Sequence, residues 1–127
     1  MKKKTVAVVD DDLVLSKTLG LCLRRRGHEV RLFDTGVDAV KYFFEDKADS
    51  IVLDIRLPDC DGWFIARLLK KLEWAEKVPL IVLSVLEADR RKLAEVRPFA
   101  HIQKPFDMGQ LMQTVEASLG SGRVGGV

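Results

Sequence analysis

The chain has 127 residues, 47% of them hydrophobic and 31% charged, a composition typical of one soluble globular domain and unlike a disordered or membrane-spanning chain. The formal net charge is +2, with lysines and arginines spread along the chain, so composition gives no case for nucleic-acid binding. Its two cysteines, Cys22 and Cys60, lack the spacing of a metal site or a disulfide framework, which favours a reducing, cytoplasmic location.

Along the chain, short apolar stretches that suit strands alternate with segments whose apolar residues recur at helical spacing. The first half predicts a strand over Thr5–Val9, a helix marked by Leu15, Leu19, Cys22 and Leu23, an alternating edge strand over Glu29–Phe33, a helix marked by Val37, Val40 and Phe44, and a buried strand over 50–53. The second half predicts a helix marked by Ile65, Leu68, Leu69 and Leu72, a strand over 79–84, a polar helix over 88–96 closed by Pro98, a strand over Ala100–Gln103, and a helix marked by Met108, Leu111, Met112, Val115 and Leu119.

This alternation predicts an α/β fold with a mainly parallel sheet covered by helices on both faces. We expect one domain over residues 1–120 and a Gly-rich tail or linker stub over 121–127. In such sheets, ligands bind beyond the carboxyl ends of the strands. The residues that end or follow the strands are therefore the candidates for a site.

Polar side chains stand at these strand ends. They are Asp10, Asp11, Asp12, Asp54, Ser84 and Lys104. Because the carboxyl ends of parallel strands share one edge, we expect these side chains to converge. Each also has an ordinary interpretation: Asp12 suits a helix N-cap, a lone serine or lysine is common at a surface, and the nearby Asp59 and Asp61 suit a turn.

Carboxylates held close together repel, so one of them would protonate unless a cation lay between them. Mg²⁺ meets this need, because it prefers oxygen ligands and keeps open positions for phosphoryl oxygens. An aspartate beside it could attack a phosphoryl group and form an acyl phosphate. Lys104 and the Ser84 hydroxyl would then neutralise charge on the phosphoryl oxygens.

The stretches "VAVVDDD", "VLDIRLPDCDG", "LIVLS" and "IQKPF" span residues 6–106. In this order they resemble the signature stretches of the receiver domain of two-component response regulators. The resemblance implies a doubly wound, flavodoxin-like fold with five parallel strands in the order 2-1-3-4-5 and five helices. It also implies a cytoplasmic phosphorelay protein that is a phosphoacceptor switch and not an enzyme acting on other substrates.

The resemblance also implies roles for individual residues. Asp54 would accept the phosphoryl group from a histidine kinase or a histidine phosphotransfer protein. Asp11 would bind Mg²⁺ directly and Asp10 mainly through water, with Asp54 and the backbone carbonyl of Arg56 as further ligands. Mn²⁺ is a possible substitute for Mg²⁺.

Three further features come with the resemblance. Lys104 would pair with the phosphate and precede a cis bond to Pro105, and the Ser84 hydroxyl would turn toward the phosphoryl group. Phosphorylation would then switch the face formed by the fourth helix, the fifth strand and the fifth helix for binding of an output partner, either separate or fused. No direct binding of nucleic acid or membrane is expected.

The sequence departs from the family in two places. The switch residue, usually Tyr or Phe, is His101, and "RPFA" replaces the usual Gly-Ala before it. The segment from Ser84 to Lys104 is also shorter than the family usually has, so we expect a rebuilt fourth helix. His101 is either a pH-sensitive replacement or a plain surface histidine. Arg56 either reaches over the site and tunes dephosphorylation or is simply solvated.

Two alternatives stay open on the residues alone. "DDDLV" fits the motif of haloacid-dehalogenase-like phosphatases, with Asp10 as nucleophile and Asp12 as acid/base, but that interpretation leaves Asp54 without a role. A degenerate receiver that serves only as an interaction module is the other. A flavin-binding protein is rejected, because three aspartates in the first loop would repel the flavin phosphate.

Overall fold

The computed structural model describes residues 3–85, 87 and 89–120. Five parallel strands form one sheet in the order β2-β1-β3-β4-β5. They are β1 (Thr5–Val9), β2 (Glu29–Phe33), β3 (Ser50–Asp54), β4 (Leu80–Ser84) and β5 (Ala100–Gln103). The helices that alternate with them are α1 (Leu13–Arg25), α2 (Gly36–Glu45), α3 (Gly62–Lys71), α4 (Arg90–Val96) and α5 (Met108–Ser118). The predicted doubly wound fold and strand order are confirmed.

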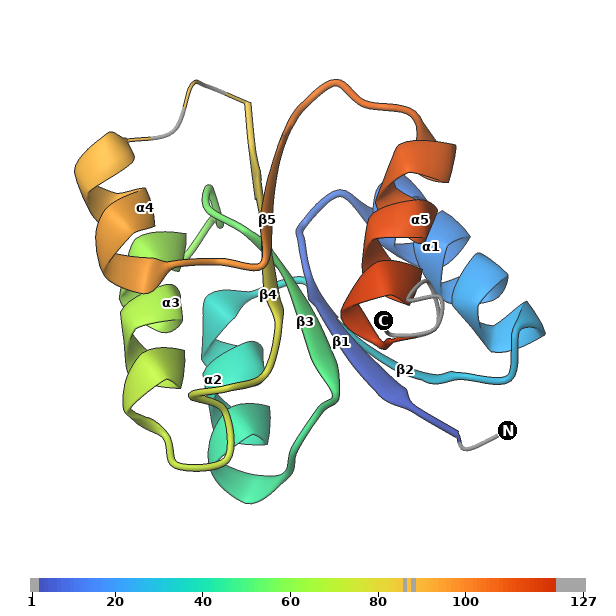
Figure 1. The fold of residues 1–127 in the computed structure, drawn as a ribbon, viewed down its shortest axis with the longest axis horizontal. Coiled ribbons are helices and arrows are strands. Elements are labelled where there is room, and N and C mark those ends of the chain that lie inside the picture. Colours follow the sequence, from blue (N-terminus) through green and yellow to red (C-terminus); the bar gives the residue numbers. More distant parts are fainter. Residues whose placement is uncertain (1–2, 86, 88, 121–127) are drawn as a thin grey trace.

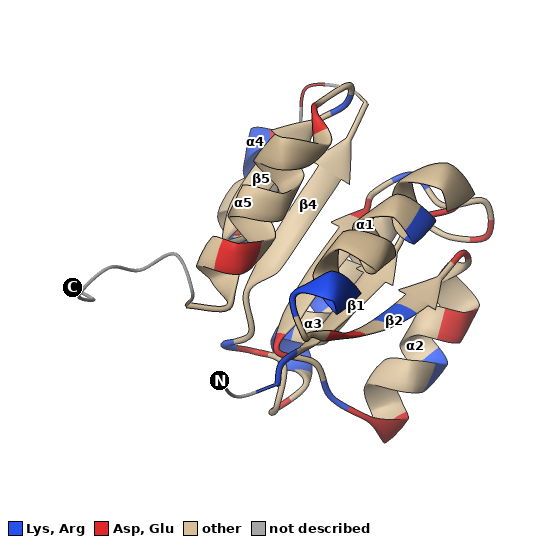
Figure 2. Cartoon of the chain, turned by 90° about the vertical axis from the view of Figure 1, so that its right-hand side faces the viewer, with Lys and Arg blue, Asp and Glu red and all other residues tan. Residues whose placement is uncertain are grey.

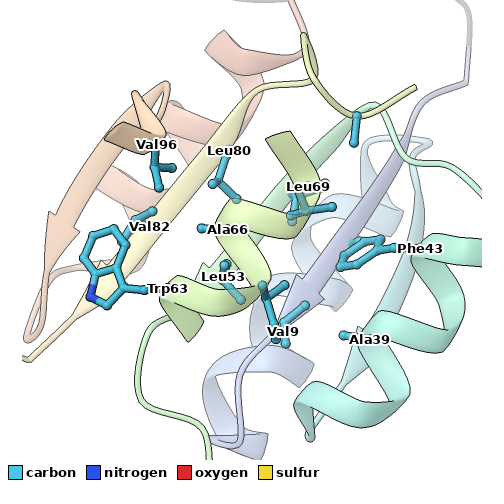
Figure 3. Close-up of a cluster of buried hydrophobic side chains, with 14 of the residues drawn as sticks. Val9, Ala39, Phe43, Leu53, Trp63, Ala66, Leu69, Leu80, Val82 and Val96 are labelled. Atoms are coloured by element: carbon cyan, nitrogen blue, oxygen red, sulfur yellow. The ribbon is translucent and has the colours of Figure 1, made fainter. Parts of the chain in front are cut away.

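Helices cover both faces of the sheet, with α1 and α5 on one side and α2, α3 and α4 on the other (Figure 1). Each face has its own apolar cluster, because side chains alternate along a strand. Leu53 and Val82 belong to the cluster beneath α2 and α3, which Figure 3 shows in close-up. Val52 and Ile81 belong to the cluster beneath α1 and α5. The central strands are thus buried on both faces, which explains their continuous apolar sequences.

The element bounds differ from the prediction at a few ends. Strand β4 begins at Leu80, one residue after Pro79, and Leu72 and Leu119 are C-caps just beyond α3 and α5. Helix α4 begins at Arg90, where the Asp89 carboxylate accepts hydrogen bonds from two backbone N–H groups of the first turn. The predicted start at 88 lies outside the described residues.

Of the three apolar residues that predicted α2, only Val40 packs against the core, where it is partly buried. Val37 and Phe44 are 52% and 63% exposed, whereas Ala39 and Phe43, four residues apart on one face, are buried. The helix carries apolar residues on both sides, so periodicity did not determine which side the sheet covers. Phe43 packs in a cluster of aromatic rings, and the centroid of its ring lies 6.0 Å from that of Trp74.

Charged residues lie mostly on the helices and loops around this core (Figure 2). This distribution follows from the cost of removing charges from water. Within the described part of the chain, no helix combines the length and apolar character needed to cross a membrane.

Candidate functional site

Backbone pairing at the ends of the strands holds the site together. The N–H of Asp10 donates to the carbonyl of Phe33 at 3.0 Å, which continues the pairing of β1 with β2. Asp54 ends β3 and is paired in register with Leu83. The N–H of Lys104 donates to the carbonyl of Ser84 at 2.7 Å, which continues the pairing of β5 with β4. The predicted convergence of these strand ends is present in the structure.

One ammonium group joins the two buried carboxylates of the site. The Lys104 Nζ lies 3.1 Å from Asp10 Oδ2 and 3.2 Å from Asp54 Oδ2. Asp10 is fully buried and Asp54 is 5% exposed, so both charges depend on protein groups for stabilisation. The side chain of Lys104 comes from the loop after β5, which carries the predicted cis bond between Lys104 and Pro105.

The second oxygen of each carboxylate is held by the loop that follows it. Asp10 Oδ1 accepts a hydrogen bond from the N–H of Asp12 at 2.9 Å, and Asp54 Oδ1 accepts one from the N–H of Arg56 at 3.0 Å. In both loops the donor stands two residues after the aspartate, a local pattern common for this residue type. Each carboxylate therefore has one oxygen fixed by its own loop and the other facing Lys104.

The negative charge of the site exceeds the positive charge that compensates it, which favours binding of a cation. The pKa of Asp10 is raised from its ordinary 3.8 to about 6. Burial is the largest cause, the N–H of Asp12 and the Lys104 ammonium oppose it, and the charge of the nearby Asp54 adds to it. Burial by itself lowers the pKa of Lys104, but the charges and hydrogen bonds of Asp10 and Asp54 outweigh it, so this pKa is raised. One lysine thus compensates two acids only in part.

A third carboxylate completes a set of oxygen donors. Asp11 is exposed, and one oxygen from each of Asp10, Asp11 and Asp54 can lie within 4.8 Å of the others. Three carboxylate oxygens, one of them open to water, suit a hard divalent cation that keeps some of its water ligands. A cation bound there would stabilise the ionised form of Asp10, whose pKa is otherwise raised mainly by burial.

The loop after Asp54 is built by contacts that the sequence only partly predicts. A Cβ on Gly62 would lie 2.6 Å from the carbonyl oxygen of Asp54, so only glycine permits this approach. Asp61 caps α3 through the N–H of Trp63, in keeping with its predicted turn role. Asp59 instead reaches the first N–H groups of α2, at 2.8 and 2.9 Å, and these hydrogen bonds lower its pKa. This contact across the fold has no local sequence signal.

Ser84 stands at the same edge, but its hydroxyl has a partner on the neighbouring strand. Its Oγ lies 2.9 Å from Nε2 of His101. Ser84 follows Val82 by two residues and so lies on the face covered by α3, whereas Asp54 shares the opposite face with Val52. The predicted switch pair of Ser84 and His101 is therefore in contact, a relation that spacing alone did not reveal.

Two other predicted residues have defined positions. Asp12 is the N-cap of α1, and its side chain accepts from the N–H of Leu15 at 3.1 Å. This is the N-cap role that the sequence suggested for Asp12. Arg56 is exposed and forms an isolated antiparallel bridge with Asp61, which fixes its backbone just beyond Asp54.

Comparison with protein families gives one assignment for nearly the whole chain. The model described as the response regulator receiver domain matches residues 6–116. This match supports the receiver interpretation and not the phosphatase interpretation.

Solved structures give the same result. The receiver domain of a sensor histidine kinase from Pseudomonas aeruginosa, with a magnesium ion coordinated in its active-site cleft, is 28% identical with a TM-score of 0.80, covering 94% of this chain and 100% of that chain. Response regulator DrrB of Thermotoga maritima, an OmpR/PhoB homologue, is 30% identical with a TM-score of 0.81, covering 94% of this chain and 54% of that chain. The chemotaxis response regulator CheY4 of Vibrio cholerae has a TM-score of 0.84 at 20% identity, over 93% of this chain and 100% of that chain, and shows the fold alone.

Proposed function

Because this chain belongs to the response regulator receiver domains, and so to two-component signalling, we propose that Asp54 is its phosphoacceptor. We take residues 1–120 as the receiver domain. The observation that carries it is the bridge from Lys104 to Asp10 and Asp54 at the edge of the sheet.

The geometry favours Asp54 over Asp10 as the nucleophile. Asp54 ends the central strand and retains slight exposure, whereas Asp10 is fully buried. In the proposed reaction, a carboxylate oxygen of Asp54 forms a bond to phosphorus as the bond from phosphorus to the donor imidazole nitrogen breaks. The products are an acyl phosphate on Asp54 and a free histidine on the donor. Lys104, already beside Asp54, would move to a phosphoryl oxygen and offset its charge.

The residues that would hold the metal are Asp10, Asp11 and Asp54, with the carbonyl of Arg56 as a further ligand. Bound Mg²⁺, for which Mn²⁺ is a possible substitute, supplies positive charge that neutralises the phosphoryl oxygens during transfer. The oxygen donors of this chain fit that ion, and a magnesium ion occupies the cleft of the related Pseudomonas receiver domain. The chain itself orients the acids through the N–H groups of Asp12 and Arg56.

The domain would act as a switch protein that mediates only its own phosphorylation and dephosphorylation. The donor is a histidine kinase or a histidine phosphotransfer protein in the cytoplasm. Phosphorylation adds about −1.5 to −2 charges at Asp54. Ser84 then turns toward the phosphoryl group, and the face of α4, β5 and α5 shifts between two populations and binds its output partner. Its direct partners are proteins and not nucleic acid or membrane.

Phosphorylation by a small donor tests the proposal. The protein is incubated with Mg²⁺ and acetyl phosphate, and intact mass is followed for one phosphoryl addition. We expect addition to the wild type and none to Asp54→Asn. Asp59→Asn is the matched control, because Asp59 is an aspartate of the same loop that contacts α2 and lies outside the acid cluster.

The outcomes separate the candidate functions. Addition that survives Asp54→Asn but is lost in Asp10→Asn would overturn the assignment and favour the phosphatase interpretation. Absence of addition in the wild type, with the metal present, would indicate a domain that only binds partners. Loss in EDTA is also expected, because the acids and Lys104 alone leave the phosphoryl charge poorly compensated.

A further inference from the structure

Large apolar side chains of α2 and α3 remain exposed within the described part of the chain. Val37 and Phe44 stand seven residues apart in α2, so they lie on one side of that helix, and both are exposed. In α3, Phe64 is 55% exposed, and Leu68, four residues later on the same side, is partly buried. The proposed phosphoacceptor reaction uses none of these side chains.

The contacts of α2 show which of its sides faces α3. The ring of Tyr42 packs on Phe33 of the edge strand β2, with 5.1 Å between the ring centroids. The side of α2 with Tyr42 therefore faces the edge of the sheet. Val37 and Phe44 lie on the opposite side of the helix, which faces α3 (Figure 1).

The contacts of α3 give the complementary result. The ammonium of Lys92 in α4 lies 5.9 Å from the centroid of the Trp63 ring, so the side of α3 with Trp63 faces α4. Phe64 and Leu68 lie on the side turned away from α4 and toward α2. Since α2 and α3 lie side by side, the exposed side chains of both helices form one apolar face (Figures 1 and 3).

Charged residues of both helices border this apolar face. On α2 they are Asp38, Lys41 and Glu45, and on α3 they are Arg67 and Lys71. The border on α2 is therefore net negative and the border on α3 is positive. Within the described part of the chain, neither Glu45 nor Lys71 forms an ion pair, so both are available to a partner.

The two helices also match in length and direction. Each has 10 residues, with Glu45 as the last residue of α2 and Lys71 as the last residue of α3. Both follow strands of one parallel sheet and so run the same way. Their first turns are close together, because Asp59, just before α3, accepts from the N–H of Gly36. Glu45 and Lys71 therefore stand at the same level on the face.

We propose that this face is an interface between two copies of the chain, related by a two-fold axis parallel to the helices. This rotation places α2 of each copy on α3 of the other, in the same direction. Glu45 then meets Lys71 of the second copy, and the pair occurs twice. Val37 would pack beside Phe64 of the second copy, and Phe44 beside Leu68, which removes apolar surface from water.

A second copy suits this face because the charges of the two helices are complementary to each other. The acidic border of one copy meets the basic border of the other, and no charged residue of another protein is needed. Three exposed apolar side chains per copy make the interface small, so we expect weak and reversible association. This inference does not depend on the proposed phosphoacceptor reaction.

Sedimentation equilibrium of the full chain tests the apolar part of the interface. At concentrations from about 10 μM to about 1 mM, we expect a monomer–dimer equilibrium with a dissociation constant on the order of 100 μM. Phe44→Gln and Phe64→Gln should each weaken it about tenfold or more. Phe99→Gln is the matched control, because Phe99 is also exposed but lies just before β5. Urea unfolding checks that each variant remains folded.

A charge exchange tests the pairing of α2 with α3. At low salt, Glu45→Lys and Lys71→Glu should each weaken association by about threefold or more, because each places like charges opposite one another twice. The double variant restores opposite charges and should return to within about twofold of the wild type.

Each contrary result would overturn the proposal. A chain that stays monomeric at about 1 mM forms no such dimer. Association that is unaffected by both Phe44→Gln and Phe64→Gln, or weakened as much by Phe99→Gln, would use another face. A double charge variant that associates no better than the two single variants would refute the placement of α2 on α3.

Discussion

Replacing Asp10 with asparagine should stabilise the metal-free protein at neutral pH. Asp10 is fully buried, and Lys104 is shared between it and Asp54. The Asn side chain keeps an oxygen that can accept the hydrogen bond from the N–H of Asp12. It removes the buried charge, which is the unfavourable feature of this position. The acid would then be retained for its function at a cost to the free energy of unfolding.

The magnitude follows from the raised pKa of Asp10. A change from 3.8 to about 6 is about 2 pKa units, or about 3 kcal/mol. Because the folded-state pKa lies above the unfolded value, the folded protein loses this stability as pH rises from about 4 to about 6. At lower pH both states are protonated and the loss is absent. The amide NH2 of asparagine would face the Lys104 ammonium, so we expect a gain of about 1–3 kcal/mol at pH 7.

Urea denaturation in EDTA measures this difference across the pH range. The advantage of Asp10→Asn should be largest above about pH 6 and vanish near pH 4. Asp11→Asn, which changes the exposed neighbour, should alter stability by about 0.5 kcal/mol or less. Mg²⁺ should narrow the gap, because it binds the folded wild type. An unchanged or lower stability of Asp10→Asn at pH 7, or a gain that is the same at all pH values, would refute this account.

Three smaller changes test other parts of the fold. Gly62→Ala places a Cβ 2.6 Å from the Asp54 carbonyl oxygen, so the free energy of unfolding measured in urea should fall by about 1–3 kcal/mol. Phosphorylation, followed by intact mass, should also slow. If both quantities stayed unchanged, the close approach would be contradicted. Arg97 has a left-handed φ of 50°, so Arg97→Gly should raise the free energy of unfolding by about 1 kcal/mol in the same assay. A lower free energy of unfolding would refute backbone strain at Arg97. Asp59→Asn should destabilise the protein at neutral pH, and the difference in stability from the wild type should disappear as pH falls through the lowered pKa of Asp59. If that difference persisted in acid, the ionised Asp59 carboxylate would not be what stabilises the start of α2.

Much of the site could be predicted because it depends on strand ends. A polar residue that ends or directly follows an apolar strand is fixed at the edge of a parallel sheet, which accounts for Asp10, Asp54 and Lys104. Boundaries were weaker where caps decide them, as at Asp89 before α4. The burial of Phe43 in α2 was not predicted, because both sides of this helix are apolar and only packing against the sheet decides that Phe43 is buried and Phe44 exposed.

The sequence by itself determined the alternation of strands and helices, the family, and which residue types gather at the carboxyl edge. Only the tertiary structure decided how they are paired. The sharing of Lys104 by two acids, the reach of Asp59 to α2 and the contact of Ser84 with His101 all join residues far apart in the chain. Local propensity reports the conformation of neighbouring residues, whereas these contacts depend on how β4 and β5, and the loops around them, are placed side by side by the sheet.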